Sequence, residues 1–285
     1  MTPINKIASK KESKNEIRPT QSVELLKELH ILTRDGKLNQ DSRRKLKQVY
    51  HLVQFIEPLM EKVLCTQDSL TLVDHGAGKS YLGFILNDLF CKLQSKPCQI
   101  IGIEIRQELV DYAINLAKNL GFNNMSFLHI SAQDSLSSPL LPDEVDIVTA
   151  LHACNTATDD AIQFSLAKKA KHIVLVPCCQ SEIAATFRKN KSLNLKNNLL
   201  SEIWRHPLHA REFGSHITNV LRCLQLEAHG YSVTVTELVG WEHSMKNELI
   251  IASFGKEAQY KHRAQEKLKD LLSELNLESL TKRFS

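Results

Sequence analysis

A glycine-containing turn lies near residue 76, in the stretch Thr71-Leu-Val-Asp-His-Gly-Ala-Gly-Lys-Ser-Tyr-Leu-Gly83. Its end, Gly78-Lys79-Ser80, matches the last part of Gly-x-x-x-x-Gly-Lys-Ser/Thr, the pattern of loops that wrap nucleotide phosphates. That pattern needs a glycine five positions before Gly78 so that the loop can curl, and this chain has Val73 there. These residues therefore exclude a phosphate-binding loop at this point.

The first part of the turn, Asp74-His-Gly-Ala-Gly78, is typical of a segment that lets an adenosyl cofactor approach the backbone. Glu104 ends the next apolar run, thirty residues after Asp74, where a carboxylate can accept hydrogen bonds from both ribose hydroxyls. Dinucleotide-binding turns share this logic, but they carry a third glycine where this chain has Tyr81. We therefore predict that S-adenosyl-L-methionine (SAM) is the cofactor, bound on this side by Asp74, Gly76, Ala77, Gly78, Tyr81, Glu104 and Ile105.

Two further segments complete the predicted cofactor pocket. Ser131-Ala-Gln-Asp134 follows the third apolar run, so that its backbone amides and the Gln133 or Asp134 side chain are placed to contact the adenine edge. Leu151 and His152 follow the fourth run and are expected at the same edge, because ligands of open α/β sheets bind at the carboxyl ends of the strands.

Histidine and cysteine side chains gather after the fourth and fifth apolar runs, in Leu151-His-Ala-Cys-Asn-Thr-Ala-Thr-Asp159 and Val176-Pro-Cys-Cys-Gln180. Zinc binding is one interpretation, although adjacent cysteines chelate poorly compared with Cys-x-x-Cys. Cysteine nucleophilic catalysis, with His152 as the activating base, is a second. We favour a third, in which Cys154, Cys178 and Cys179 pack the floor of the pocket while His152 and Asp159 supply polar contacts. We accordingly predict no metal.

Methyl transfer needs an oriented acceptor and, for a hydroxyl, a group that removes or stabilises its proton. His152 and Asp159 are the candidate base or orienting residues. Lys246, in the loop Glu242-His-Ser-Met-Lys-Asn247, can polarise a ribose hydroxyl or hold a phosphate, with Glu242 positioning it; the alternative is a plain hairpin turn stabilised by Asn247. The chain lacks the Asn/Asp-Pro-Pro-Tyr turn of enzymes that methylate exocyclic amines, which favours another acceptor atom such as a hydroxyl.

Alternating strand-like and helical segments must position these residues. The helical stretches include 81–93, 107–120, closed by Gly121, and 156–171. Such alternation predicts a parallel sheet with helices on both faces, followed by a helix over 218–229 and an antiparallel hairpin at the sheet edge. The predicted strands are 70–73, 99–103, 125–130, 145–150, 172–176, 231–239 and 248–254.

The ends of the chain are predicted to be helical or unpatterned. Residues 22–65 show helical spacing in two runs, separated at Asp35-Gly36, and Asp41-Ser42 suits the N-cap of the second run. The last thirty residues read as a charged helix with leucines at 268, 271, 272 and 275, to which no chemistry is assigned.

The positive charge of the chain is concentrated. The net charge is +4, while residues 1–20 carry five Lys/Arg against two Glu and residues 187–211 carry six against one, which leaves −4 for the rest. Solvated loops explain this placement, and so does a surface for an anionic polymer such as RNA, with Trp204 as an aromatic within it. Two alternatives stay open. The chain is either a methyltransferase for a protein or small molecule, with residues 187–211 as a substrate lid, or a non-catalytic SAM-binding module.

Composition places the protein among cytoplasmic globular chains. Its hydrophobic fraction of 42% is enough for a substantial core. The N-terminal residues lack the apolar stretch that a secretory signal contains, so none is expected there. No apolar run approaches the roughly 20 residues that span a bilayer. The seven cysteines are scattered and predict reduced thiols, not a disulfide framework.

Together, Asp74–Gly83, Leu151–Asp159, Val176–Gln180 and Trp241–Ala252 resemble a class I SAM-dependent methyltransferase family with a His-x-Cys…Thr-Asp segment and a Cys-Cys segment. Bacterial methyltransferase-domain proteins are similar, also over Asp41–Gln48 and Arg211–Arg222, and the eukaryotic tRNA acceptor-stem 2′-O-methyltransferase more distantly. The likeness, over roughly 35–255, implies an RNA-modifying enzyme, with tRNA ribose 2′-O as a candidate acceptor. Gln180 replaces the histidine that follows the paired cysteines in the tRNA enzyme, which weakens that substrate assignment.

The implied fold is a Rossmann-like class I methyltransferase sheet of seven strands, the last antiparallel, with an N-terminal helical cap. The expected organisation is a disordered basic arm (1–20), a helical cap (21–66), a methyltransferase domain (67–255) with a basic insertion (187–217), and a C-terminal helix (256–285). The oligomeric state is left open.

Overall fold

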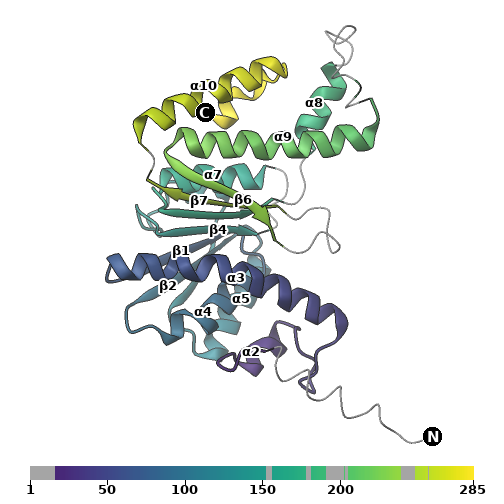
Figure 1. Cartoon of the computed structure of the whole chain (residues 1–285). Coiled ribbons are helices and arrows are strands. Elements are labelled where there is room, and N and C mark those ends of the chain that lie inside the picture. The colour runs from purple at the N-terminus through teal and green to yellow at the C-terminus, as the bar shows by residue number, and fades with distance from the viewer. Residues whose placement is uncertain are drawn as a thin grey trace, which may run out of the picture. The chain divides into compact units, whose positions relative to one another are not determined.

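The computed structural model describes residues 17–151, 156–177, 181–190, 202, 205–238, 248–255 and 257–285. The chain divides into two compact units, residues 1–129 and 130–285, each of which is treated by itself below. The strands are ordered β3-β2-β1-β4-β5-β7-β6 in a seven-stranded sheet (Figure 1). This mixed α/β sheet is the fold class predicted from the alternation of strand and helix patterns.

The first unit contains a parallel three-stranded part of the sheet. β2 pairs with β1 on one side and with β3 on the other, and Asp74 lies opposite Gly102. β1 and β2 are buried at nearly every position, as expected for parallel strands covered by helices. Its elements are α2 (Val23–Glu28), α3 (Gln40–Thr66), β1 (Leu70–His75), α4 (Tyr81–Leu89), the 3-10 turn Cys91–Leu93, β2 (Cys98–Glu104), α5 (Gln107–Leu120) and β3 (Met125–His129).

The start of α3 differs from the prediction. The N-cap is Asn39, whose side-chain oxygen accepts a hydrogen bond from the Ser42 amide at 2.8 Å, and not Asp41-Ser42. The predicted cap was wrong because asparagine caps helices as well as aspartate and serine do, and only the backbone conformation selects among neighbouring candidates.

The second unit carries the antiparallel end of the sheet. β5 is parallel to β4, whereas β7 is antiparallel to both β5 and β6, as predicted for the final strands. Its elements are α6 (Ala132–Ser135), β4 (Ile147–Leu151), α7 (Ala157–Ala167), β5 (His172–Val176), α8 (Glu182–Asn190), α9 (Pro207–Ala228), β6 (Tyr231–Glu237), β7 (Glu248–Phe254), α10 (Ala258–Glu274), the 3-10 turn Glu278–Leu280 and α11 (Thr281–Phe284).

Helix α9 begins at Pro207, eleven residues before the predicted start at Thr218. Proline suits the first helical turn, where its missing N–H needs no partner. Gly214 lies in the middle of the helix, where a Cβ would stand 2.7 Å from the backbone nitrogen of Ala184 in α8. The predicted start was too late, and the glycine inside the helix serves close packing against α8. Part of the predicted basic insertion is therefore helical.

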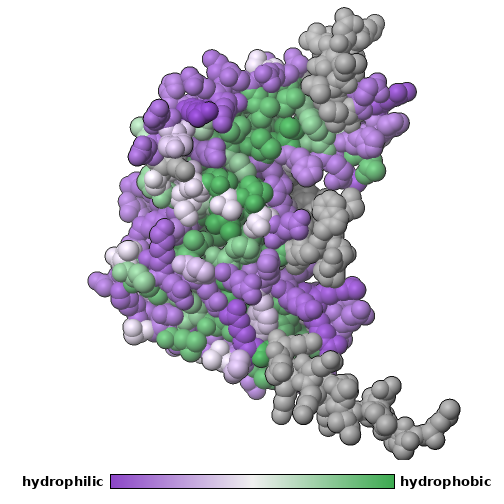
Figure 2. All heavy atoms as spheres, viewed as in Figure 1, coloured by the Kyte–Doolittle hydropathy of each residue, from purple (hydrophilic) through white to green (hydrophobic). Residues whose placement is uncertain are grey.

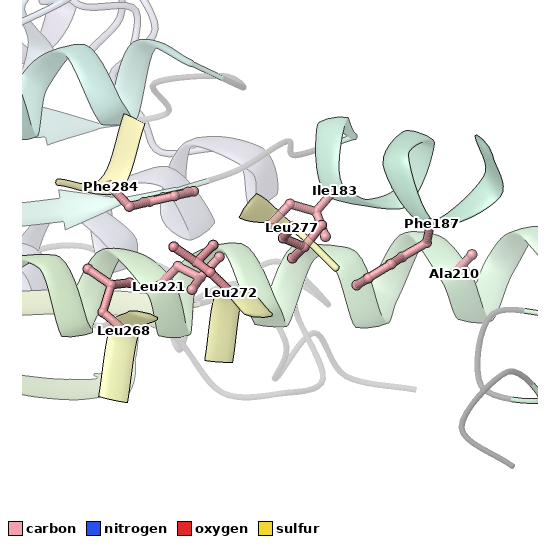
Figure 3. Packing of buried hydrophobic residues seen from close by; sticks show 8 residues of the cluster. All are labelled: Ile183, Phe187, Ala210, Leu221, Leu268, Leu272, Leu277 and Phe284. Carbon is pink, nitrogen blue, oxygen red and sulfur yellow. The ribbon is translucent and has the colours of Figure 1, made fainter. Parts of the chain in front are cut away.

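The C-terminal segment packs against α8 and α9 in one hydrophobic cluster (Figure 3). Phe187 of α8 lies over α9, with its ring 5.7 Å from that of Phe213, and Phe284 reaches the same helix near Leu221. Figure 2 shows hydrophobic side chains over α9 and α10, bordered by hydrophilic ones. The buried members of the cluster are Ile183, Phe187, Ala210, Leu221, Leu268, Leu272, Leu277 and Phe284.

Cys91 and Cys98 form a disulfide bond, so the expectation of reduced thiols throughout was wrong for this pair. It failed because spacing along the chain does not show that the 3-10 turn and the start of β2 bring two sulfurs together. Within the described residues, no helix combines the length and apolar character needed to cross a bilayer.

Candidate functional site

The turn after β1 has the backbone of a ligand-approach loop. Gly76 and Gly78 adopt φ of +70° and +58°, and Ser80 adopts +53° directly before α4. Such angles are readily reached by glycine but costly for most other residues. Among the described residues, no atom would lie within 4 Å of a Cβ on Gly76, so this part of the chain leaves the space in front of the turn open. Ala77 fixes the turn by donating its amide hydrogen bond to Ile103 of β2 at 2.9 Å.

Glu104 ends β2 beside this turn, as predicted. Its carboxylate is only 6% exposed, and Oε2 accepts a hydrogen bond from the Gly78 amide at 2.8 Å. Oε1 accepts from the amides of Ile105 and Arg106, both at 3.1 Å. The structure therefore brings the acidic residue and the glycine turn together, which is the arrangement that a ribose diol requires.

Arg106 is a feature of this site that sequence reasoning missed. Its Nε donates to Glu104 Oε1 at 2.9 Å, and its Nη2 lies 3.3 Å from Oε2. Burial by itself raises the pKa of the Glu104 carboxyl, but the hydrogen bonds from Arg106 and Gly78 and the Arg106 charge outweigh it and hold that pKa below its usual value. The sequence did contain a signal for this contact, because Arg106 is a basic residue two positions after Glu104, the expected ribose-binding acid.

Ile105 and Tyr81 border the same turn with apolar surface. Ile105 directly follows Glu104 and is 64% exposed. Tyr81 opens α4, and burial raises the pKa of its hydroxyl. Lys79 lies with Nζ 5.5 Å from the ring centre of Tyr112, so its charge faces an aromatic ring.

Asp74 and His75, the last residues of β1, are buried at 3% and 4% exposure. Burial lowers the pKa of His75 to about 4, and the ring is therefore neutral at pH 7.

In the second unit, the predicted adenine-side residues lie at the start of α6 and the end of β4. Gln133 and Asp134 are exposed, and Ser131 caps the helix by accepting a hydrogen bond from the Asp134 amide at 3.1 Å. The Ser131 hydroxyl also donates to Asp134 Oδ2 at 2.5 Å. Leu151 is half-buried at the last position of β4.

Asp159 belongs to a buried polar network. Its Oδ1 accepts a hydrogen bond from Arg222 Nε of α9 at 2.6 Å, with side-chain exposures of 6% and 1%. Arg222 Nη1 donates to Asn219 at 3.2 Å, and Asn219 Nδ2 donates to Glu248, the first residue of β7, at 2.6 Å. The network ties α7, α9 and β7 together. From the sequence, Arg222 was noted only as the last residue of Arg211–Arg222, the segment that resembles bacterial methyltransferase-domain proteins.

Several predicted site residues lie outside the described residues. They are His152, Cys154, Cys178, Cys179, Glu242 and Lys246. Their roles, and the choice among zinc binding, cysteine catalysis and simple packing, stay predictions.

Comparison with known proteins adds to this geometry. Residues 44–186 match a protein family described as "Methyltransferase domain", which is half of the chain. The chain is 25% identical over 239 residues to the glutathione S-transferase C-terminal domain-containing protein of Bos taurus, covering 78% of this chain and 35% of that protein. The Drosophila melanogaster homologue is 27% identical over 237 residues, covering 75% and 37%. The chain thus spans about a third of the length of these curated relatives.

Two solved structures are also similar. An rRNA methylase from Streptococcus thermophilus has a TM-score of 0.43 at 9% identity, covering 71% of this chain and 95% of that chain. A precorrin-6y C5,15-methyltransferase from Geobacter metallireducens GS-15 has a TM-score of 0.40 at 19% identity, covering 70% and 88%.

Proposed function

This chain belongs to the methyltransferase domain family, and on that premise we propose that it transfers a methyl group from SAM to RNA. The observation that carries the cofactor assignment is the buried carboxylate of Glu104, bonded to the Gly78 amide at the end of β2. The residues present fit an adenosyl group. The turn at Gly76 leaves open space for the ligand, Glu104 offers acceptors for ribose hydroxyls, and exposed Ile105 offers an apolar surface for the adenine ring.

When bound, SAM supplies an electrophilic methyl group, and the chain must orient the acceptor toward it. We propose that Asp159 acts mainly by position: through Arg222 it fixes the first turn of α7, which directly follows the segment containing His152. His152 then orients the acceptor or takes its proton, and Lys246 with Glu242 contacts a ribose hydroxyl or phosphate.

RNA as the acceptor rests on the placement of charge. Residues 1–20 and 187–211 carry 11 of the 36 Lys and Arg residues against 3 of the 32 acidic ones, a density suited to phosphate contacts. In the described part of the second stretch, Arg205 and Arg211 are exposed, each with an adjacent acidic partner. A ribose 2′-hydroxyl is the acceptor that we favour, because the chain lacks the turn typical of exocyclic amine methylation.

The test is transfer of labelled methyl groups from SAM to total cellular RNA and to total protein, followed by digestion of the RNA to nucleosides. We expect label in RNA, in 2′-O-methylated nucleosides. Glu104→Gln is the negative control. It keeps the shape of the side chain but removes the anionic acceptor for the ribose, and it should abolish transfer. Label in protein alone would refute the RNA assignment. SAM binding without turnover on any of these substrates would favour a non-catalytic module.

A salt series provides an independent check of the RNA assignment. Each phosphate contact releases counterions, so the affinity for RNA should fall steeply between about 50 and 200 mM salt. Replacing Lys189, Lys191 and Lys196 with alanine should flatten that dependence. The control is a second triple substitution, in which Lys261, Lys267 and Lys269 of α10 are replaced with alanine, because it removes the same amount of charge elsewhere. A salt slope that the first triple substitution leaves unchanged would argue against a phosphate grip in 187–211.

A further inference from the structure

We propose that Arg106 competes with the cofactor ribose for Glu104, so that the guanidinium must leave this carboxylate before the cofactor binds. The inference rests on the proposed function, because it takes the ligand of Glu104 to be an adenosyl ribose. It gives Arg106 the role of a residue that sets cofactor affinity without touching the reacting atoms.

The first step is to count donors against acceptor positions. A carboxylate offers about four lone-pair positions. Glu104 already accepts five hydrogen bonds, from the amides of Gly78, Ile105 and Arg106 and from Nε and Nη2 of the Arg106 side chain. The carboxylate is therefore saturated, and two ribose hydroxyls cannot bind unless donors leave.

The second step identifies the donors that can leave. The three amides are held by the backbone, because Gly78 belongs to the fixed turn after β1 and the other two open the connection to α5. The Arg106 side chain is 58% exposed, so water can solvate its guanidinium once it leaves the carboxylate. Release of Nε and Nη2 leaves three amide donors, and the two hydroxyls of a ribose diol would restore the total of five hydrogen bonds that this carboxylate now accepts.

The third step concerns where the guanidinium lies. A Cβ added to Gly78 would come within 3.9 Å of Arg106 Nη2, which places the guanidinium over the glycine. The absence of a side chain on Gly78 is the feature that lets a ligand approach the backbone. Arg106 thus covers both the acceptor and the approach surface. Motion of this one exposed side chain clears them together.

Competition by a charged group has a measurable signature. Salt screens the attraction between a half-exposed guanidinium and a carboxylate, and therefore weakens the competitor. A ligand without net charge should then bind more tightly as salt rises. S-adenosylhomocysteine is such a ligand near pH 7.5, because its amino and carboxylate charges cancel.

The experiment measures S-adenosylhomocysteine binding by calorimetry to the full chain, at about 50 and 300 mM KCl. We expect Arg106→Ala to tighten binding at low salt by roughly two- to fivefold, the range for a partly exposed ion pair, and to lose the salt dependence of the parent. Arg106→Lys should fall between the two, since a lysine keeps the charge but not the two-pronged geometry. Lys118→Ala, an exposed charge on α5, is the matched control and should behave as the parent.

The outcomes separate the two proposals. No binding by the parent at either salt concentration would overturn the cofactor assignment and this inference with it. Parent binding that Arg106→Ala weakens or leaves unchanged would overturn the competition alone, because Arg106 would then support the bound state or be irrelevant to it. Thermal unfolding of each variant verifies that the affinities refer to folded protein.

Discussion

Buried, neutral His75 should make the stability of this protein depend on pH between about 6.5 and 4. Burial lowers the pKa of its ring from an ordinary value near 6.5 to about 4. Between these two values the unfolded chain binds a proton that the folded chain does not, so the free energy of unfolding falls as the pH falls. The contribution is complete above about 6.5 and absent below about 4.

The size of the effect follows from the shift. A tenfold change in proton affinity is worth about 1.4 kcal/mol, so His75 makes about 3 kcal/mol of stability pH-dependent. Of this, about 2.5 kcal/mol is lost between pH 7.5 and 4.5. His75→Gln keeps a polar side chain that does not titrate, and it should lose that much less stability over the same range.

Urea unfolding followed by far-UV circular dichroism at several pH values measures this difference. Other titrating groups contribute to the parent and to His75→Gln alike, and they cancel in the comparison. His262→Gln is the control for the substitution itself, because that histidine has a side-chain exposure of 74%. The reasoning is wrong if the parent and His75→Gln lose the same free energy between pH 7.5 and 4.5.

Two substitutions test the packing around the second unit. Arg222→Met leaves the buried Asp159 carboxylate without its guanidinium and should lower the free energy of unfolding by about 3–5 kcal/mol. Arg211→Met on the same helix removes an exposed ion pair and should lower the free energy of unfolding by less than about 1 kcal/mol. If urea unfolding shows equal losses for the two variants, the buried Arg222–Asp159 pair does not stabilise the fold as inferred. Gly214→Ala places a Cβ 2.7 Å from the backbone of α8 and should destabilise by roughly 1–3 kcal/mol, despite alanine's better helix propensity. A raised melting temperature would show that α8 can move away at no cost.

The first half of the candidate site was predictable because it depends on residues adjacent to strand ends. β1 and β2 are rich in apolar residues, and Glu104 and the turn at Gly76 lie at the ends of these strands. In a parallel sheet those ends must meet at one edge. Local pattern and sheet geometry together were therefore enough to bring Glu104 beside Gly78.

The contacts that sequence reasoning missed depend on partners distant along the chain or on side-chain direction. Arg222 pairs with Asp159 across 63 residues, and no periodicity records such a pairing. Arg106 is close to Glu104 in sequence, but only the direction of its side chain shows that it occupies the carboxylate. The close approach of Gly214 to the backbone of α8 likewise involves a separate helix, so the pattern within α9 does not record it.

The position of β7 in the sheet has a consequence for how the second unit folds while the chain is being synthesised. β7 follows β6 in the chain, yet it lies between β5 and β6 and pairs with both. Until Glu248–Phe254 has been made, β6 has no strand to pair with, and the side of β5 that will receive β7 is an unpaired edge. Unpaired strand edges favour association between chains. A nascent chain that stalls before residue 248 should therefore depend on chaperones, and release of that dependence should coincide with the synthesis of β7.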